Sequence, residues 1–188
     1  SVKWDGAPAV VCGTNPDNGQ FFVGTKSVFA QAAKINYTKK DIATNHGTDE
    51  LGQKLLKCLV HLKKLNIPGV VQGDLLYTDE DITRKNIDGK PHLTFTPNQI
   101  TYAVPEGGDL AKQIDRAKVG IIFHTTYTGD SLASMNAQGG ADVSSFVKSN
   151  DVFFDNASYK DVSGSAKFTD DETKKFYNSI EKLEALLD

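Results

Sequence analysis

Two short apolar runs, at residues 7–13 and 20–25, open the pattern of hydrophobic and polar positions along the chain. Between them lies Asn15-Pro16-Asp17-Asn18-Gly19, a segment rich in turn-forming residues. Proline presets φ and an Asn-Gly pair tolerates positive φ, so this segment favours a tight reversal of the chain. The pattern predicts a β-hairpin.

Residues 48–65 carry apolar residues at helical spacing, followed by Pro68 and Gly69, which end a helix. The apolar positions are Leu51, Leu55, Cys58, Leu59, Leu62 and Leu65. Thr48 is expected to cap the start of this helix, and the acidic residues after it suit its positive end. A second, shorter helix is expected at residues 109–117, with Leu110 and Ile114 facing the core.

The remaining apolar runs read as strands. Residues 69–77 resemble a buried strand, 119–127 form the strongest β run, and 151–155 are expected to add one more. Residues 92–96 and 99–104 are expected to pair around Pro97-Asn98. The Gly-, Ser- and Asn-rich residues 129–141 predict a loop. Residues 169–172 have capping-box form before a helical pattern that reaches Leu187.

Strand hairpins with segregated helices predict an α+β fold with an antiparallel sheet.

The composition agrees with one domain over residues 1–188, with its motifs in 1–129 and a loop and helix in 130–188. Hydrophobic residues make up 39% and charged residues 24% of the chain, as in ordinary globular proteins. The chain contains no run of 18 apolar residues, so no membrane span is expected. Cys12 and Cys58 are expected to be reduced and buried, which indicates a cytoplasmic protein. Met135 is the sole methionine, and we expect the fold to be incomplete at both ends.

The formal net charge is −3, whereas a protein that binds nucleic acid over its whole surface is usually basic. The nearest basic cluster, Lys34, Lys39 and Lys40, is followed by Asp41. Any contact with a polynucleotide is therefore expected to be local.

The motif that carries chemistry is Lys3-Trp4-Asp5-Gly6. A lysine amine can attack the α-phosphate of ATP and form a phosphoramide with AMP, and a glycine three residues later lets the backbone pass close to a nucleotide. The plain alternative is a surface turn with a solvated lysine, because four residues alone are weak evidence.

The order of the later segments resembles the covalent nucleotidyltransferases, which comprise ATP-dependent DNA and RNA ligases and mRNA-capping enzymes. The wider segment, including residues 120–129 (GIIFHTTYTG), is similar to ligase-like proteins of tailed bacteriophages, and a phage-encoded protein would be expected in the host cytoplasm. The resemblance implies that Lys3 is the nucleophile and that Lys26, after Phe21-Phe22-Val23-Gly24-Thr25, contacts nucleotide or substrate. It also implies that Asp74, in Gly73-Asp74, binds the ribose hydroxyls and a metal, and that Tyr102 stacks on adenine. Trp4, Asp5 and Gly6 are expected to line the same nucleotide site, with ATP and Mg²⁺ as cofactors.

Three features depart from that family. Pro8 stands where many members have Arg or Asn, Asp74 replaces a longer Glu, and the later Glu-Gly and Lys-x-Lys strands are not found. Val147-Lys148 and Ala166-Lys167 lack the expected context. Two hypotheses remain: an enzyme that forms lysyl-AMP at Lys3 and seals DNA or RNA ends, and a non-catalytic phage structural or binding protein with the ligase fold.

Other signals have plainer explanations. The four histidines show no metal-ligand spacing, and His124 is expected to be a hydrogen-bonded core or rim residue rather than a phosphate contact. Gly107-Gly108-Asp109 is expected to be a turn before an Asp cap rather than an anion site. Residues 79–81 predict a solvated acidic turn, with a cation site near Asp74 as the alternative.

Overall fold

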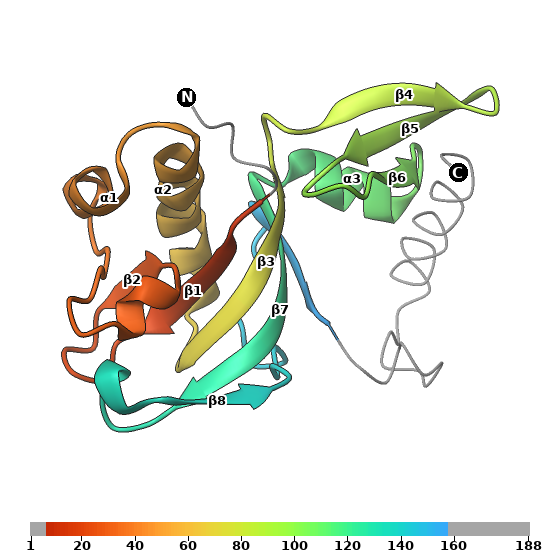
Figure 1. Cartoon of the computed structure of the whole chain (residues 1–188). Helices are drawn as coiled ribbons and strands as arrows, with labels where there is room; N and C mark the ends of the chain where they lie inside the picture. Colours follow the sequence, from red (N-terminus) through yellow and green to blue (C-terminus); the bar gives the residue numbers. More distant parts are fainter. Residues whose placement is uncertain (1–6, 158–188) are drawn as a thin grey trace.

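The computed structural model describes residues 7–157, which form two β-sheets with helices packed against each (Figure 1). The larger sheet has the strand order β2-β1-β3-β7-β8, and β9 pairs with β7 beside β8. The smaller sheet has the order β4-β5-β6. All pairings are antiparallel except β7 with β9, which is parallel. The α+β fold with antiparallel sheets is therefore confirmed.

The predicted hairpin consists of β1 (Ala9–Thr14) and β2 (Phe21–Gly24). Its turn is held by side chains, since the Asn15 carboxamide oxygen accepts from the Asp17 amide at 2.9 Å and Gly19 has φ of 73°. A short 3₁₀ turn, η1 (Lys26–Phe29), follows β2.

Helix α1 (Lys39–His46) was not anticipated from the apolar pattern, because only Ile42 of its residues is buried. Its start is defined by a capping box instead. The Thr38 hydroxyl accepts from the Asp41 amide at 3.1 Å, and the Asp41 carboxylate accepts from the Thr38 amide at 3.1 Å.

Helix α2 (Glu50–Leu62) continues into the 3₁₀ turn η2 (Lys63–Leu65), as the apolar spacing predicted. The expected cap at Thr48 was wrong: Asp49 is the N-cap residue and makes no side-chain cap bond. The Thr48 carbonyl instead accepts from the Gln53 side chain at 3.2 Å.

Strands β3 (Val70–Thr78) and β7 (Val119–Thr128) are the long central strands and match their predicted ranges closely. Strand β9 (Val152–Asn156) was also predicted. The loop expected at 129–141 contains the turn η3 (Leu132–Ser134) and strand β8 (Asn136–Gly139), whose four exposed residues carry no hydrophobic alternation.

The smaller sheet contains the predicted pair β5 (Lys90–Phe95) and β6 (Tyr102–Pro105). Strand β4 (Thr83–Ile87) was not expected, because it is almost entirely exposed. Helix α3 (Asp109–Arg116) buries Leu110 and Ile114 as predicted, although its N-cap is Gly108 rather than Asp109.

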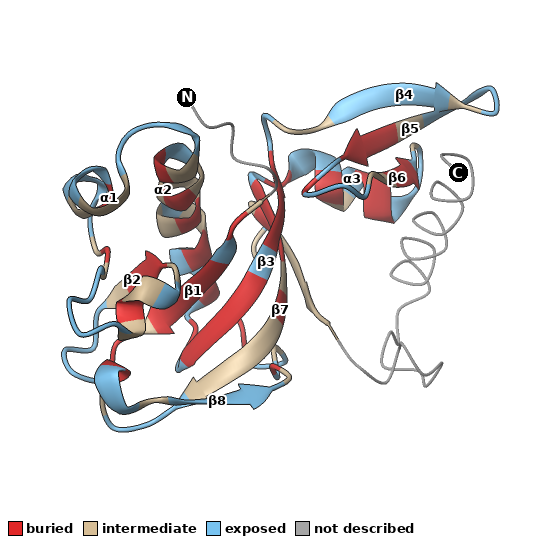
Figure 2. Cartoon of the chain, in the orientation of Figure 1, coloured by how far each residue is buried: buried red, intermediate tan, exposed pale blue. Residues whose placement is uncertain are grey.

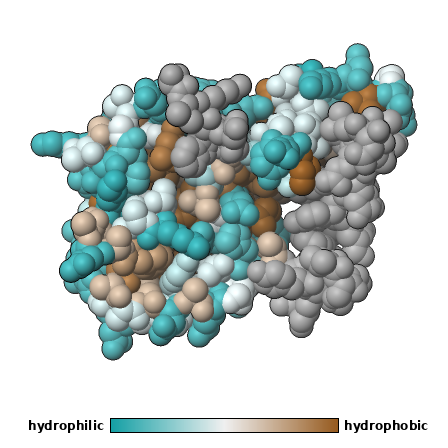
Figure 3. All heavy atoms as spheres, viewed as in Figure 1, coloured by the Kyte–Doolittle hydropathy of each residue, from teal (hydrophilic) through white to brown (hydrophobic). Residues whose placement is uncertain are grey.

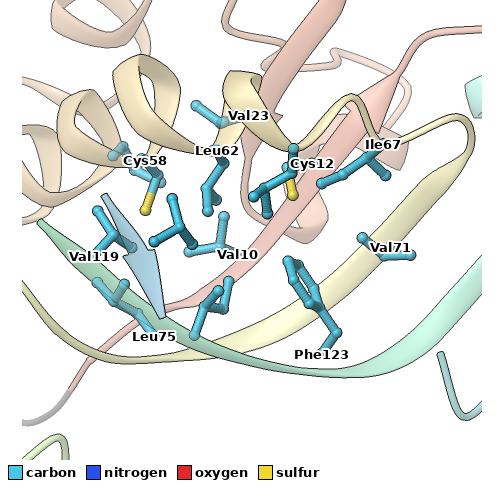
Figure 4. Packing of buried hydrophobic residues seen from close by; sticks show 14 of the residues in the cluster. Val10, Cys12, Val23, Cys58, Leu62, Ile67, Val71, Leu75, Val119 and Phe123 are labelled. Carbon is cyan, nitrogen blue, oxygen red and sulfur yellow. The ribbon is translucent and has the colours of Figure 1, made fainter. Parts of the chain in front are cut away.

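Three apolar clusters hold these elements together, and Figure 2 shows the buried residues concentrated along β1, β3 and β7. The largest lies between α2 and one face of the larger sheet; Cys12 and Cys58 both point into it (Figure 4). The opposite face packs against η1 and η3 at one end. At its other end, Leu76 joins the cluster formed by the smaller sheet and α3.

Both cysteines are free and buried, as predicted. Burial is the main cause that raises the pKa of the Cys58 thiol to about 12, and it raises the pKa of Cys12 as well. Within the described part of the chain, no helix has the length and apolar character needed to span a membrane.

Candidate functional site

A row of polar side chains crosses the face of the larger sheet that α2 does not cover. Alternation along β3 places Val71 and Leu75 in the cluster under α2, and so directs Gln72 and Asp74 to the opposite face. The ends of this face are closed by the cluster around η1 and by the smaller sheet. Asp74 lies between them, with a side chain that is 66% exposed.

Asp74 is held by His124 of the neighbouring strand. His124 Nε2 lies 3.2 Å from Asp74 Oδ1, and His124 Nδ1 lies 2.7 Å from the Thr125 hydroxyl. The expectation that His124 is a hydrogen-bonded rim residue is confirmed, since its side chain is 24% exposed. Its partner, however, is the residue predicted to bind ribose.

A β-bulge explains how this pair forms. Gln72 pairs with Thr125 and Gly73 pairs with Phe123, so His124 is an extra residue in the ladder between β3 and β7. A bulge re-aims the side chain of the extra residue. Here it directs the imidazole toward Asp74. The periodicity of β7 gave no indication of this shift, because every residue from Val119 to Thr128 fits a continuous β run.

A second polar pair extends the row. Tyr127 donates its hydroxyl hydrogen to Gln72 Oε1 at 2.7 Å. Gln72 is buried although polar, and this bond satisfies its oxygen. The sequence reasoning did not single out either residue; alternation along β3 and β7 was the signal that would have placed them together.

The start of the described chain runs directly beside Asp74. Ala9 of β1 pairs with Asp74, and the Pro8 carbonyl accepts from the Leu75 amide at 3.2 Å. The Ala7 amide donates to the carbonyl of Pro97, in the connection between β5 and β6. This segment therefore joins the central strand of one sheet to the smaller sheet.

The predicted site residues are placed as follows. Lys3, Trp4, Asp5 and Gly6 lie outside the described residues. Lys26 is exposed in η1, which packs on the same sheet face as Asp74. Gly24, two residues before Lys26, lies on β2 and pairs with Val11 of β1, which in turn pairs with β3. Gly24 is therefore two strands, or about 10 Å, from β3.

Tyr102 is half-buried and belongs to the smaller sheet. It pairs with Phe95, and the two rings meet edge to face with centroids 5.4 Å apart. Phe95 is two residues before Pro97, whose carbonyl accepts from the Ala7 amide. Tyr102, paired with Phe95, therefore lies at the end of the smaller sheet that the N-terminal segment contacts.

Asp74 is the only one of the predicted residues with a metal-binding side chain among those the structure describes. In residues 7–157 no group of three or more His, Cys, Asp or Glu side chains could hold a metal ion. Mg²⁺ commonly takes one or two carboxylates, together with water and substrate phosphates. A single carboxylate at Asp74 fits that mode of binding and not a closed protein cage.

The acidic turn at residues 79–81 was expected to be solvated, but two of its carboxylates are engaged by other residues. Asp79 forms an ion pair with Lys57 of α2, and Asp81 accepts from the Thr78 amide at 2.7 Å. Partial burial is the largest single influence and raises the pKa of Asp79, but the hydrogen bond and charge of Lys57, with smaller contributions from a backbone hydrogen bond and Lys118, together lower the pKa below its ordinary value. A pocket of about 220 Å³ beside this turn is lined by both signs of charge. These ion pairs favour a structural role for the turn.

Comparison with curated proteins and with solved structures finds no match for the chain. Comparison with protein families finds one whose match extends over residues 1–188. The chain therefore belongs to DUF6267, a family of unknown function.

Proposed function

We propose that this protein is an ATP-dependent nucleotidyltransferase of the ligase type that forms a lysyl-AMP intermediate at Lys3. The observation that carries the proposal is the pairing of Ala9 with Asp74, together with the bonds from Leu75 to Pro8 and from Ala7 to Pro97. Lys3 is four residues before Ala7, and four residues of chain extend at most about 14 Å. Chain length alone therefore limits how far the Lys-x-Asp-Gly motif can lie from the contact of Ala7 with Pro97, and this supports a site shared with Asp74 and the strand that carries Tyr102.

These contacts are informative because the residues involved are far apart in sequence. If Lys3 belonged to an unrelated surface turn, residues 7–9 would have no reason to be anchored beside Gly73-Asp74 and the β5–β6 connection. The resemblance to the nucleotidyltransferases, by contrast, requires the nucleophile motif, the carboxylate and the aromatic strand to share one nucleotide site.

In the proposed reaction the neutral Lys3 amine attacks the α-phosphorus of ATP. A P–N bond forms, the bond from the α-phosphorus to the bridging oxygen breaks, pyrophosphate leaves, and the amine loses a proton. Mg²⁺ would neutralise charge on the phosphates. Asp74 would accept hydrogen bonds from the ribose hydroxyls, oriented by His124, and AMP would then pass to a 5′-phosphorylated DNA or RNA end.

The test is covalent labelling of the full-length protein with ATP labelled at the α-phosphate, in the presence of Mg²⁺. Label should survive denaturation, be released by acid and resist alkali, as expected of a phosphoramide. Lys3→Ala should abolish it, and so should Lys3→Arg, because a guanidinium stays protonated and cannot attack. Lys148→Ala, which removes an exposed lysine outside the site, should label normally.

Asp74→Ala should weaken ATP binding by about 1.5–3 kcal/mol, the usual scale for a hydrogen bond to a charged group. Asp130→Ala is the matched control, because Asp130 is exposed and has no described partner. Labelling that persists in Lys3→Ala would exclude the mechanism.

The second candidate is a non-catalytic phage structural or binding protein that retains the fold. The observation that favours it is that β7, β8 and β9, the described strands after β6, carry no lysine, whereas the ligase family has a Lys-x-Lys strand. A full-length protein that takes no label from any nucleoside triphosphate would support this alternative.

A further inference from the structure

The β4–β5 hairpin presents two lysines and a histidine on one face. Lys85 pairs with His92 and Ile87 pairs with Lys90, and paired residues of antiparallel strands share a face. Leu93 pairs with Arg84 on the opposite face, where Leu93 joins the buried cluster with α3. Lys85, Lys90 and His92 therefore face away from α3.

The two lysines on this face are available to a ligand. Lys85 and Lys90 are exposed and form no ion pair with any residue in the described range 7–157. Arg84, on the other face, is engaged by Glu106 and by Asp115, the latter at 2.9 Å. The His92 Nδ1–H donates to the Lys90 carbonyl at 2.8 Å, which holds the ring beside the lysines.

The hairpin projects from the molecule (Figure 1), and most of its visible surface is hydrophilic (Figure 3). It carries three cationic residues against one carboxylate, Asp88, in a chain whose net charge is −3. Phe95 is five residues after Lys90, which corresponds to about 17 Å of strand. Strand β5 therefore runs from the cationic residues toward the region where the N-terminal segment contacts Pro97.

We propose that the β4–β5 hairpin binds the phosphate backbone of a polynucleotide and directs its end toward the Asp74 site. This inference deepens the proposed function and rests on it for the reaction, although the binding itself needs no ATP. Lys90 and the Lys85–His92 pair lie two residues apart along the strand, about 7 Å, which corresponds to roughly two phosphates of one strand of a duplex at 3.4 Å each. Two lysines with a histidine fit a short, sequence-independent contact.

An acidic protein is a poorer fit for the same face. Protein interfaces depend on buried aromatic and arginine anchors and are depleted in lysine. This face offers only the half-buried Ile87 and the exposed Pro105 as apolar residues. Its recognition chemistry is therefore electrostatic and suits regularly spaced phosphates.

The experiment is fluorescence anisotropy of labelled single-stranded DNA, duplex DNA and single-stranded RNA with the full-length protein, without ATP, at several salt concentrations. The Lys85→Glu/Lys90→Glu protein should bind at least about 10-fold more weakly, and its log–log salt slope should fall by about 2. Lys39→Glu/Lys40→Glu makes the same change in net charge on exposed residues of α1 and should change neither quantity appreciably. Comparison of the three nucleic acids identifies the source of the phosphates.

Three results would overturn the inference. One is unchanged affinity in Lys85→Glu/Lys90→Glu, which would mean that the lysines only protect the open edge of β4 from pairing. Another is an equal loss in both double variants, which would indicate a general charge effect. The third is tighter binding of poly-glutamate than of any oligonucleotide, which would indicate an acidic protein partner. Labelling at Lys3 by ATP alone should be unaffected in Lys85→Glu/Lys90→Glu. Loss of polynucleotide binding by the β4–β5 hairpin can therefore be distinguished from failure of the proposed chemistry.

Discussion

Asp74 shows how an exposed carboxylate is oriented without being buried. The backbone of β3 fixes its position, and His124 and Thr125 limit the directions its oxygens take. Aspartate is one methylene shorter than the glutamate typical of ligase-type enzymes, so a ribose bound as proposed would have to approach β3 more closely. Ala9 pairs with Asp74 and therefore shares its face of the sheet, and its small side chain would leave room for that approach.

His46 supports a prediction about pH at the residue scale. Partial burial, with the charge of Lys34 as the second cause, lowers the pKa of His46, and its Nε2 is buried without a hydrogen-bond partner among the described residues. The unfolded chain therefore binds the proton more readily than the folded protein. Stability should decrease as the pH falls below about 6.5, the ordinary value for histidine.

His46→Gln should lose less stability than the parent protein between pH 7.5 and pH 5.5, as measured by urea midpoints. His61, whose pKa is also lowered by burial, remains in both proteins and should leave a residual dependence. Identical pH profiles for the two proteins would show that His46 titrates normally in the folded state.

At the scale of elements, the contact between β3 and β7 depends on Gly73. A Cβ at this position would lie 2.7 Å from the Ile122 carbonyl oxygen and 3.0 Å from the Ile121 side chain. Both neighbours belong to the central strand β7 and have little room to move. The bulge that presents His124 to Asp74 lies immediately beside this close approach.

Gly73→Ala should therefore destabilise the protein by about 1–3 kcal/mol, the usual cost of overpacking a core. Gly69→Ala is the matched control, because a Cβ there meets nothing within 4 Å and Gly69 does not have a positive φ. Chemical denaturation of both variants gives the comparison. A loss in Gly69→Ala as large as in Gly73→Ala would refute the role of the close approach.

Elements with a strong apolar pattern could be predicted, and those without one could not. Helix α2 was predicted because Leu55, Cys58 and Leu62 share a buried stripe. Strands β4 and β8 bury no residue and left no periodic signal. The Thr48 cap was wrong because Thr48 and Asp49 are both residue types that favour the N-cap, so local preference did not decide between two adjacent positions.

At the scale of the whole molecule, the segment at Ala7 and Pro8 links the two sheets. If nucleotide binds where the proposal requires, both sides of this junction should become more protected from solvent. ATP with Mg²⁺ should slow hydrogen exchange in residues 74–76 and 96–102 of the full-length protein, and should leave α1 unchanged. Asp74→Ala should reduce the protection. Slowing confined to α1 and its neighbours would exclude a nucleotide site at the junction.

The sequence by itself determined the turn chemistry, the amphipathic stripe of α2, the central strands and hence the α+β class, because these depend on residues close together along the chain. It also identified Lys26, Asp74 and Tyr102 as candidates through motif order. Only the tertiary structure decided that His124 is bulged onto Asp74, that β9 lies parallel to β7, and that Lys85, Lys90 and His92 share one face. The direction and register of the paired strands set these features, and both depend on packing across the whole sheet.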